Sequence, residues 1–208
     1  MKKIVLLIIL FGCCINADAS DTLDTKQWKQ CFIKDANLKF YYPSFILQLD
    51  TTNNELNFSH SIHYKHPYPC NFTEVEMDSV NEITDLAFTI QSFKTNLKGV
   101  VKNILSDYFM KIYFSSDTLK TDEGFINKIK LGKQQWYKIE MGAEGCGQYL
   151  FVCPVNEKLT LQIRMPYASD CNFGLYNQWT NPDYLSLKGL MLPTQSQKIF
   201  YKILESIH

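Results

Sequence analysis

Residues 55–65 read Glu-Leu-Asn-Phe-Ser-His-Ser-Ile-His-Tyr-Lys, and this stretch decides the fold class. Apolar or ring-bearing side chains alternate with polar ones along it, which predicts a β-strand with one buried face. The face predicted to be buried carries Leu56, Phe58, His60, Ile62 and Tyr64. One-sided strands of this kind are typical of an antiparallel sheet.

The same period of two recurs along the chain. It is found in residues 86–90, 125–131, 137–141, 149–153 and 159–165. Gly132-Lys133 and Asn156-Glu157 indicate hairpin turns between the later strands. Residues 38–42 and 45–49 are predicted to form an opening strand pair around Pro43-Ser44. The pattern predicts one antiparallel sheet of about six or seven strands.

Two segments carry the helical period instead. Residues 97–109 place apolar side chains at i, i+3, i+4 and i+7, which predicts an amphipathic helix. Thr194-Gln195-Ser196-Gln197 follows Pro193 and has the form of a capping box, with an apolar stripe from Ile199 to Ile207 behind it. Each helix must bury a face, so the prediction is an α+β domain over residues 36–208, an α/β/α sandwich-like arrangement with helices packed on the sheet.

The first residues have the pattern of an export signal. Lys2 and Lys3 precede an apolar run, and Ala17-Asp18-Ala19 supplies small residues for cleavage after residue 19. Residues 20–35 are then predicted to be a tether. A second interpretation stays open, because Leu10-Phe11-Gly12-Cys13 resembles a lipobox; the signal would then be residues 1–12, with a lipid on Cys13. Either way the mature protein is expected to be periplasmic or secreted, or an outer-membrane lipoprotein.

Composition restricts the partners. The 208 residues include 21 Lys+Arg against 21 Asp+Glu, and Arg164 is the single arginine. Because neither sign of charge dominates, we expect no nucleic-acid partner. No cofactor is predicted, and membrane contact is expected only through a lipid anchor. The remaining partners are another protein or a small ligand.

Five cysteines remain after cleavage at residue 19, and an exported protein meets an oxidising environment. An odd number leaves at least one thiol unpaired. One arrangement pairs Cys70 with Cys146 and Cys153 with Cys171 and leaves Cys31 free. Other pairings stay open.

The stretch Glu144-Gly145-Cys146-Gly147 is the most distinctive short motif. It offers Cys146 as a nucleophile, His60 or His63 as a base, and Glu144 or Asp170 to orient that base. No family-specific catalytic signature accompanies these residues. A tight turn anchored by a disulfide is the preferred interpretation of the motif.

Three histidines lie within seven residues, at His60, His63 and His66. Residues three apart in a strand point to opposite faces, which places His60 on the apolar side and His63 in solvent. His63 and His66 are the candidate metal ligands that remain, and two imidazoles do not complete a closed site. No metal is therefore predicted.

A long segment between Pro166 and Pro193 shows no clear period, and loops of that length are often functional. It carries aromatic residues suited to ligand or partner contact or to packing over the sheet. These residues are Tyr167, Phe173, Tyr176, Trp179 and Tyr184.

The order of the predicted elements resembles a known architecture. An opening hairpin with Phe40-Tyr41-Tyr42-Pro43, a further strand, a central helix, a meander and a closing helix are similar to the PsbP-like α/β/α sandwich of lumenal photosystem subunits and small exported bacterial lipoproteins. The resemblance covers most of residues 36–208. Members of that group are mainly binding or assembly factors, so the resemblance implies a non-enzymatic role and transfers no functional residue.

Taken together, the sequence predicts an exported, non-catalytic binding or interaction protein. The alternative is an exported hydrolase or effector enzyme with a site around Glu144, Cys146 and His60.

Overall fold

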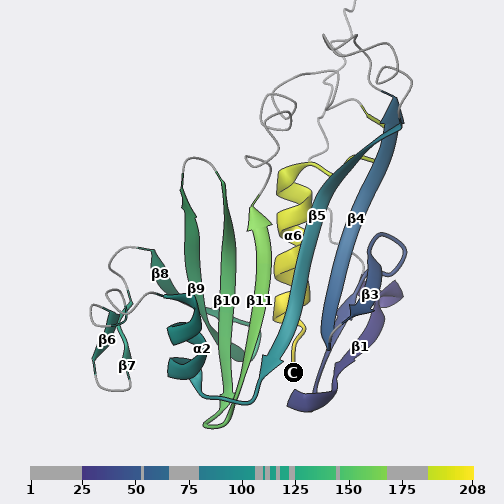
Figure 1. Cartoon of the computed structure of the whole chain (residues 1–208). Coiled ribbons are helices and arrows are strands. Elements are labelled where there is room, and N and C mark those ends of the chain that lie inside the picture. Colours follow the sequence, from purple (N-terminus) through teal and green to yellow (C-terminus); the bar gives the residue numbers. More distant parts are fainter. Residues whose placement is uncertain are drawn as a thin grey trace, which may run out of the picture.

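A seven-stranded antiparallel sheet forms the centre of the molecule (Figure 1). The computed structural model describes residues 25–52, 54–65, 80–105, 110, 113–115, 118–121, 125–143, 146–167 and 187–208. Across the sheet, the strand order is β3-β4-β5-β11-β10-β9-β8. In chain order the strands are β3 (Gln48–Thr52), β4 (Glu55–Lys65), β5 (Val80–Phe93), β8 (Ile126–Leu131), β9 (Gln134–Ala143), β10 (Cys146–Asn156) and β11 (Leu159–Tyr167). The predicted α+β class with one main sheet is confirmed.

The two faces of the sheet carry different layers. Helix α6 (Pro193–Glu205) and the hairpin of β1 (Lys29–Ile33) and β2 (Leu38–Tyr42) pack on one face, and helix α2 (Leu97–Ile104) packs on the other. Figure 1 shows α2 and α6 on opposite sides of the strands. The small elements are the 3₁₀ turns Thr25–Gln27 and Lys34–Ala36 and the two-residue strands β6 (Phe114–Ser115) and β7 (Thr118–Leu119). None of the helices in the described ranges is long and apolar enough to cross a membrane.

Aromatic rings fill the core beneath α6. Phe88 stacks on Phe58 with ring centroids 4.8 Å apart. Phe200 of α6 meets Phe88 at 5.3 Å and Phe151 at 5.1 Å. Offset and edge-to-face pairs of this kind add stability beyond the area they bury. They attach α6 to β4, β5 and β10, as expected from the apolar alternation of these strands.

Strand β10 is apolar on both faces. Phe151 and Cys153 lie in the core beneath α6, whereas Leu150 and Val152 lie in the core beneath α2. All four residues are almost completely buried. A strand covered on both faces cannot show the alternation of a half-buried strand, so β10 departs from the one-sided pattern.

The prediction for the beginning of the domain was wrong. Residues 45–49 do not pair with residues 38–42; instead β2 pairs with β1, and β3 starts at Gln48 and pairs with β4. The predicted tether over 20–35 therefore contains a strand, and Trp28 and Ile33 are buried in the core. Asn37 provides the turn into β2 with a φ of 49°. The five residues of β1 are too few to show a period of their own.

The helix boundaries also differ from the prediction. Leu105 is extended, with φ −95° and ψ 142°, so α2 ends at Ile104, and residues 106–109 lie outside the described part. Helix α6 begins at Pro193, one residue before the predicted capping box. The side chain of Gln195, rather than that of Gln197, accepts a hydrogen bond from the Leu192 N–H at 3.0 Å.

Both predicted hairpin turns are confirmed. Gly132 lies between β8 and β9 with a φ of 58°, a conformation that favours glycine. Between β10 and β11, the Asn156 side chain accepts a hydrogen bond from the Lys158 N–H at 2.9 Å.

Candidate functional site

His60 is paired with a carboxylate that the sequence did not identify. Its Nδ1 lies 2.6 Å from Oδ1 of Asp85, whose side chain has no exposed surface. The two strands change register here, because His60 lies opposite Leu86 while Ser61 lies opposite Thr84. Asp85 is the extra residue of this β-bulge, and bulges re-aim side chains. His60 was placed on the face predicted to be buried, and in the structure 18% of its side chain is exposed.

Asp85 also holds the start of α6. Its Oδ2 accepts a hydrogen bond from the Met191 N–H at 2.6 Å, and its carbonyl oxygen accepts one from the Ser196 hydroxyl at 3.0 Å. A carboxylate near a helix N-terminus is stabilised by the helix dipole. Both carboxylate oxygens of Asp85 are thus hydrogen-bonded within the fold. These contacts explain why the carboxylate is buried beside His60, and no catalytic role is needed to explain it.

The sheet order separates His60 from Cys146. His60 is on β4 and Cys146 begins β10, with β5 and β11 between these strands. Three strand spacings of about 4.8 Å amount to roughly 14 Å, which is too far for a hydrogen bond between a nucleophile and its base. Glu144 and Asp170, the proposed orienting residues, lie outside the described residues. The partner of His60 is Asp85 instead.

Two of the cysteines are free thiols in the structure. Cys153 is buried, and its Sγ lies 3.8 Å from Oε1 of Gln134; desolvation by burial raises its pKa to about 12. The pairing of Cys153 with Cys171 therefore finds no support, and Cys171 lies outside the described residues. Cys31 is free, in agreement with the arrangement that leaves it unpaired, and burial raises its pKa too.

Other predicted site residues lie outside the described part of the chain. They are Cys13, His66, Cys70, Phe173, Tyr176, Trp179 and Tyr184. His63 is exposed, as predicted. No group of three potential metal ligands occurs among the residues that the structure describes. Tyr167 ends β11, at the point where that described segment stops.

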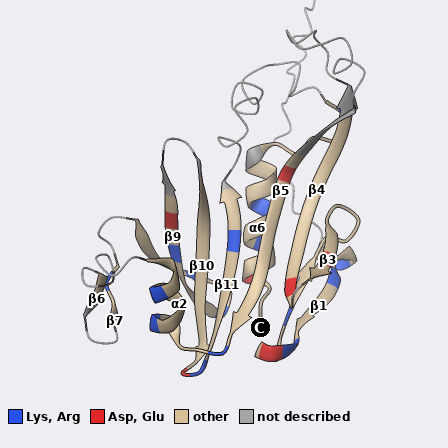
Figure 2. Ribbon diagram, in the orientation of Figure 1, with Lys and Arg blue, Asp and Glu red and all other residues tan. Residues whose placement is uncertain are grey.

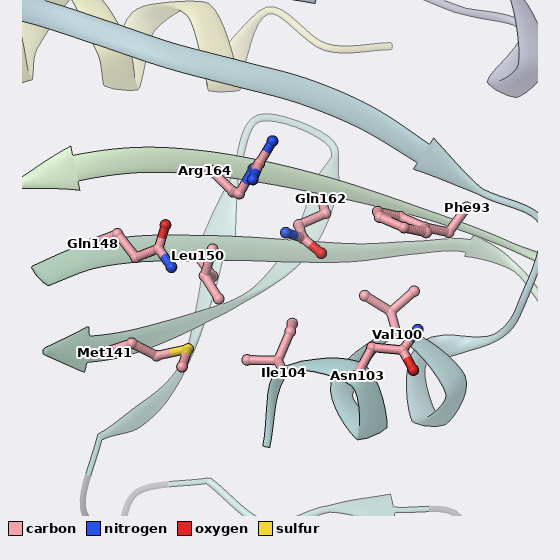
Figure 3. A pocket seen from close by; sticks show the side chains of 9 residues that line it. All are labelled: Phe93, Val100, Asn103, Ile104, Met141, Gln148, Leu150, Gln162 and Arg164. Atoms are coloured by element: carbon pink, nitrogen blue, oxygen red, sulfur yellow. The ribbon is translucent and has the colours of Figure 1, made fainter. Parts of the chain in front are cut away.

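A pocket lies between α2 and the sheet (Figure 3). Its volume is about 240 Å³, slightly below the range for drug-sized ligands. Five apolar residues line it, Phe93, Val100, Ile104, Met141 and Leu150, and four polar ones, Asn103, Gln148, Gln162 and Arg164. An apolar lining with a few polar groups is typical of a small-ligand site.

The strand registers place these residues together. Leu150 of β10 lies directly opposite Arg164 of β11, and Gln148 of β10 lies opposite Met141 of β9. Gln162 is two residues before Arg164, so both point to the same face of the sheet. From α2, Val100, Asn103 and Ile104 are spaced i, i+3 and i+4, which puts them on one face of the helix.

Gln162 is the most unusual of these residues. Only 8% of it is exposed, yet no hydrogen bond joins its side-chain amide to another residue in the described part of the chain. Figure 3 shows its amide among the side chains that line the pocket, between Leu150 and Phe93. Among the described residues, the fully buried side-chain N and O atoms without a partner are Nε1 of Trp28 and Nε1 of Trp136, so the Gln162 amide is not a buried unsatisfied group. A ligand in the pocket would meet this amide as both a donor and an acceptor of hydrogen bonds.

Arg164 is already partnered. Its Nη2 lies 3.2 Å from both carboxylate oxygens of Glu55, which is its ion-pair partner among the described residues. The side chains of Arg164 and Glu55 are 42% and 23% exposed. Figure 2 shows that most of the described positions along β4, β5, β10 and β11 are neither basic nor acidic.

The sequence contained part of this information. The alternation of residues 159–165 puts Gln162 and the single arginine on the polar face of a strand, which predicts exposure to solvent. That face is instead half covered by α2, and strand periodicity cannot show which helix covers a sheet. Asp85 could have been found as a lone acidic residue beside the apolar run Leu86-Ala87-Phe88.

Comparisons with known proteins give no family. No family model and no curated protein matches the chain. A solved structure of a protein from Bacteroides thetaiotaomicron VPI-5482 is similar, with a TM-score of 0.42 and 13% sequence identity. The match covers 88% of this chain and 48% of that chain, so the present chain spans about half the length of its structural neighbour.

Proposed function

We propose that this protein is exported and binds a small ligand, without transforming it, in the pocket between α2 and the sheet. The observation that carries the proposal is the pocket itself, in which five apolar residues surround the little-exposed side chain of Gln162, and that amide is not hydrogen-bonded to another described residue. A few polar groups in a mostly apolar pocket are typical of small-ligand sites.

The chemistry of the lining favours binding over catalysis. The nine lining residues are aliphatic or aromatic side chains, a thioether, three amides and one guanidinium. Common nucleophiles and general bases, such as Ser, Cys, His, Asp and Glu, are not among these nine residues. The resemblance to the PsbP-like sandwich, whose members mainly bind or assemble, supports the same class of function.

A fragment screen with matched variants tests ligand binding. The screen records ¹H–¹⁵N NMR shifts of the protein with a library of small molecules. Gln148→Trp fills the pocket from its half-buried rim, and Gln197→Trp makes the same change at an exposed position of α6. We expect bound fragments to shift Gln162, Leu150 and Arg164, and to be lost only in Gln148→Trp. Fragments that bind both variants equally, or no fragment in the pocket, would refute the proposal.

Export is tested by the intact mass of the mature protein. Cleavage after Ala19 or a lipid on Cys13 would each give a defined mass, measured with and without reduction and alkylation. A mature protein that retains residues 1–19 unmodified would show that the export part of the proposal is wrong.

A further inference from the structure

The polar lining of the pocket is rich in groups that both donate and accept hydrogen bonds. Asn103, Gln148 and Gln162 each end in a carboxamide, which has two N–H donors and an acceptor oxygen. None of the three amides is hydrogen-bonded to another described residue. A ligand that offers both an N–H and a C=O would match such a set, whereas a carboxylate group only accepts hydrogen bonds and an ammonium group only donates them.

The charge at the rim also favours an uncharged ligand. Arg164 is the single charged residue of the pocket lining, and Glu55 holds one of its nitrogens through both carboxylate oxygens. A ligand carboxylate that approached Arg164 would lie close to the Glu55 carboxylate, and like charges at such distances repel. A ligand cation would meet the guanidinium. The compensated pair therefore lowers the affinity for either kind of ion.

The apolar residues of the pocket determine which apolar group the ligand carries. Val100, Ile104 and Leu150 present branched aliphatic surface beside the amides, because Leu150 lies between Gln148 and Gln162 on the sheet and Asn103 adjoins Val100 and Ile104 on α2 (Figure 3). The volume of about 240 Å³ leaves room for a compact group only. An aliphatic group bonded to a carboxamide fits this mixed lining. Apolar burial would provide the affinity, and pairing of the amides would provide the specificity.

We infer that the ligand is a small, uncharged carboxamide with a branched aliphatic group, of the chemistry of a leucine residue within a peptide. This inference rests on the proposed binding function and names the ligand class of the same pocket.

Three probes of nearly equal shape test the ligand class. N-acetyl-leucinamide is neutral, N-acetyl-leucine is an anion and leucinamide, at pH 6, is a cation. NMR titration of the full chain should give the neutral probe an affinity at least about tenfold higher than that of either ion. Gln162→Leu should lower the affinity for the neutral probe about tenfold, which is the effect of losing one good hydrogen bond. A cooperative thermal transition of the variant checks that it is folded.

The second arm changes the charge at the rim. Glu55→Gln removes the negative charge that pairs with Arg164. The affinity for the anionic probe should therefore rise about tenfold, and the affinity for the neutral probe should change by less than about threefold. Glu157→Gln, at the exposed β10–β11 turn, is the matched control and should change neither affinity.

The outcomes separate the two proposals. If an ionic probe binds more tightly than the neutral one, or if no leucine probe binds while other fragments still occupy the pocket, the ligand class is wrong and the binding function stands. If no molecule of either set shifts the pocket residues, both proposals fail.

Discussion

Asp85 connects three elements through one residue. Its carboxylate accepts hydrogen bonds from His60 in the middle of β4 and from Met191 just before α6, while its own backbone forms the bulge of β5. A fully buried carboxylate is tolerated only when such partners compensate its desolvation. Asp85 therefore fixes where α6 begins relative to the sheet.

Asp85→Asn is expected to lower the free energy of unfolding by about 2–3 kcal/mol, because the neutral amide accepts hydrogen bonds less strongly than the carboxylate and its NH₂ group pairs with His60 only if Nδ1 is the acceptor. Asp50→Asn, at an exposed residue of β3, is the control and should change the stability by less than about 0.5 kcal/mol. Urea denaturation measures both variants. Equal transition midpoints for the two variants would show that Asp85 is not a structural anchor.

For single residues, the sequence predicts burial or exposure better than it predicts hydrogen-bond partners. The alternation of residues 55–65 correctly places Phe58 in the core and His63 in solvent. It cannot predict that Asp85 is the partner of His60, because the bulge that brings them together depends on the register of two strands.

The hairpin of β8 and β9 touches the end of α6 at Gly132. A Cβ built on Gly132 would overlap the carbonyl oxygen and backbone of Glu205. Gly189 also has a positive φ, of 91°, but a Cβ there would reach nothing closer than a methyl of Ile62 at 3.5 Å. Substitution of Gly189 therefore measures the cost of a positive φ alone. Substitution of Gly132 measures that cost together with the cost of the overlap with Glu205.

Gly132→Ala is expected to destabilise the protein by about 2 kcal/mol more than Gly189→Ala does. In both variants the alanine is strained by a positive φ, but only the methyl group at residue 132 also displaces the end of α6. Thermal unfolding of the two variants provides the comparison. The same loss in both would indicate that the hairpin and α6 adjust without cost.

Helices, strands and turns were predictable where the pattern that indicates them lies in neighbouring residues. Strand alternation and the turns at Gly132 and Asn156 depend on neighbouring residues, and both turns were predicted correctly. The pairing of β2 with β1 was missed, because β1 has five residues and its burial depends on α6 and β2. The pocket was missed for a related reason, since it requires α2 to lie over the polar face of β11.

The part of the molecule that the structure describes contains two hydrophobic cores, one on each face of the sheet. Phe200, Phe151 and Phe88 belong to the core under α6, and Val101 and Leu150 belong to the core under α2. Because β10 contributes alternate residues to both cores, neither core can lose its packing without disturbing this strand. We therefore expect a single cooperative unfolding transition, as in most small domains.

Substitutions on the two sides test this cooperativity. Phe200→Ala should cost about 3–5 kcal/mol and Val101→Ala about 2 kcal/mol, from lost burial and the cavity that remains. Lys102→Ala, at the exposed neighbour of Val101, is the control and should have little effect. Native-state hydrogen exchange then decides the matter. If the domain unfolds as one unit, Val101→Ala lowers the protection of the most stable amides of α6 and α2 by the same free energy. If protection falls only around α2, the pocket side unfolds independently, and ligand binding there would leave the α6 side unchanged.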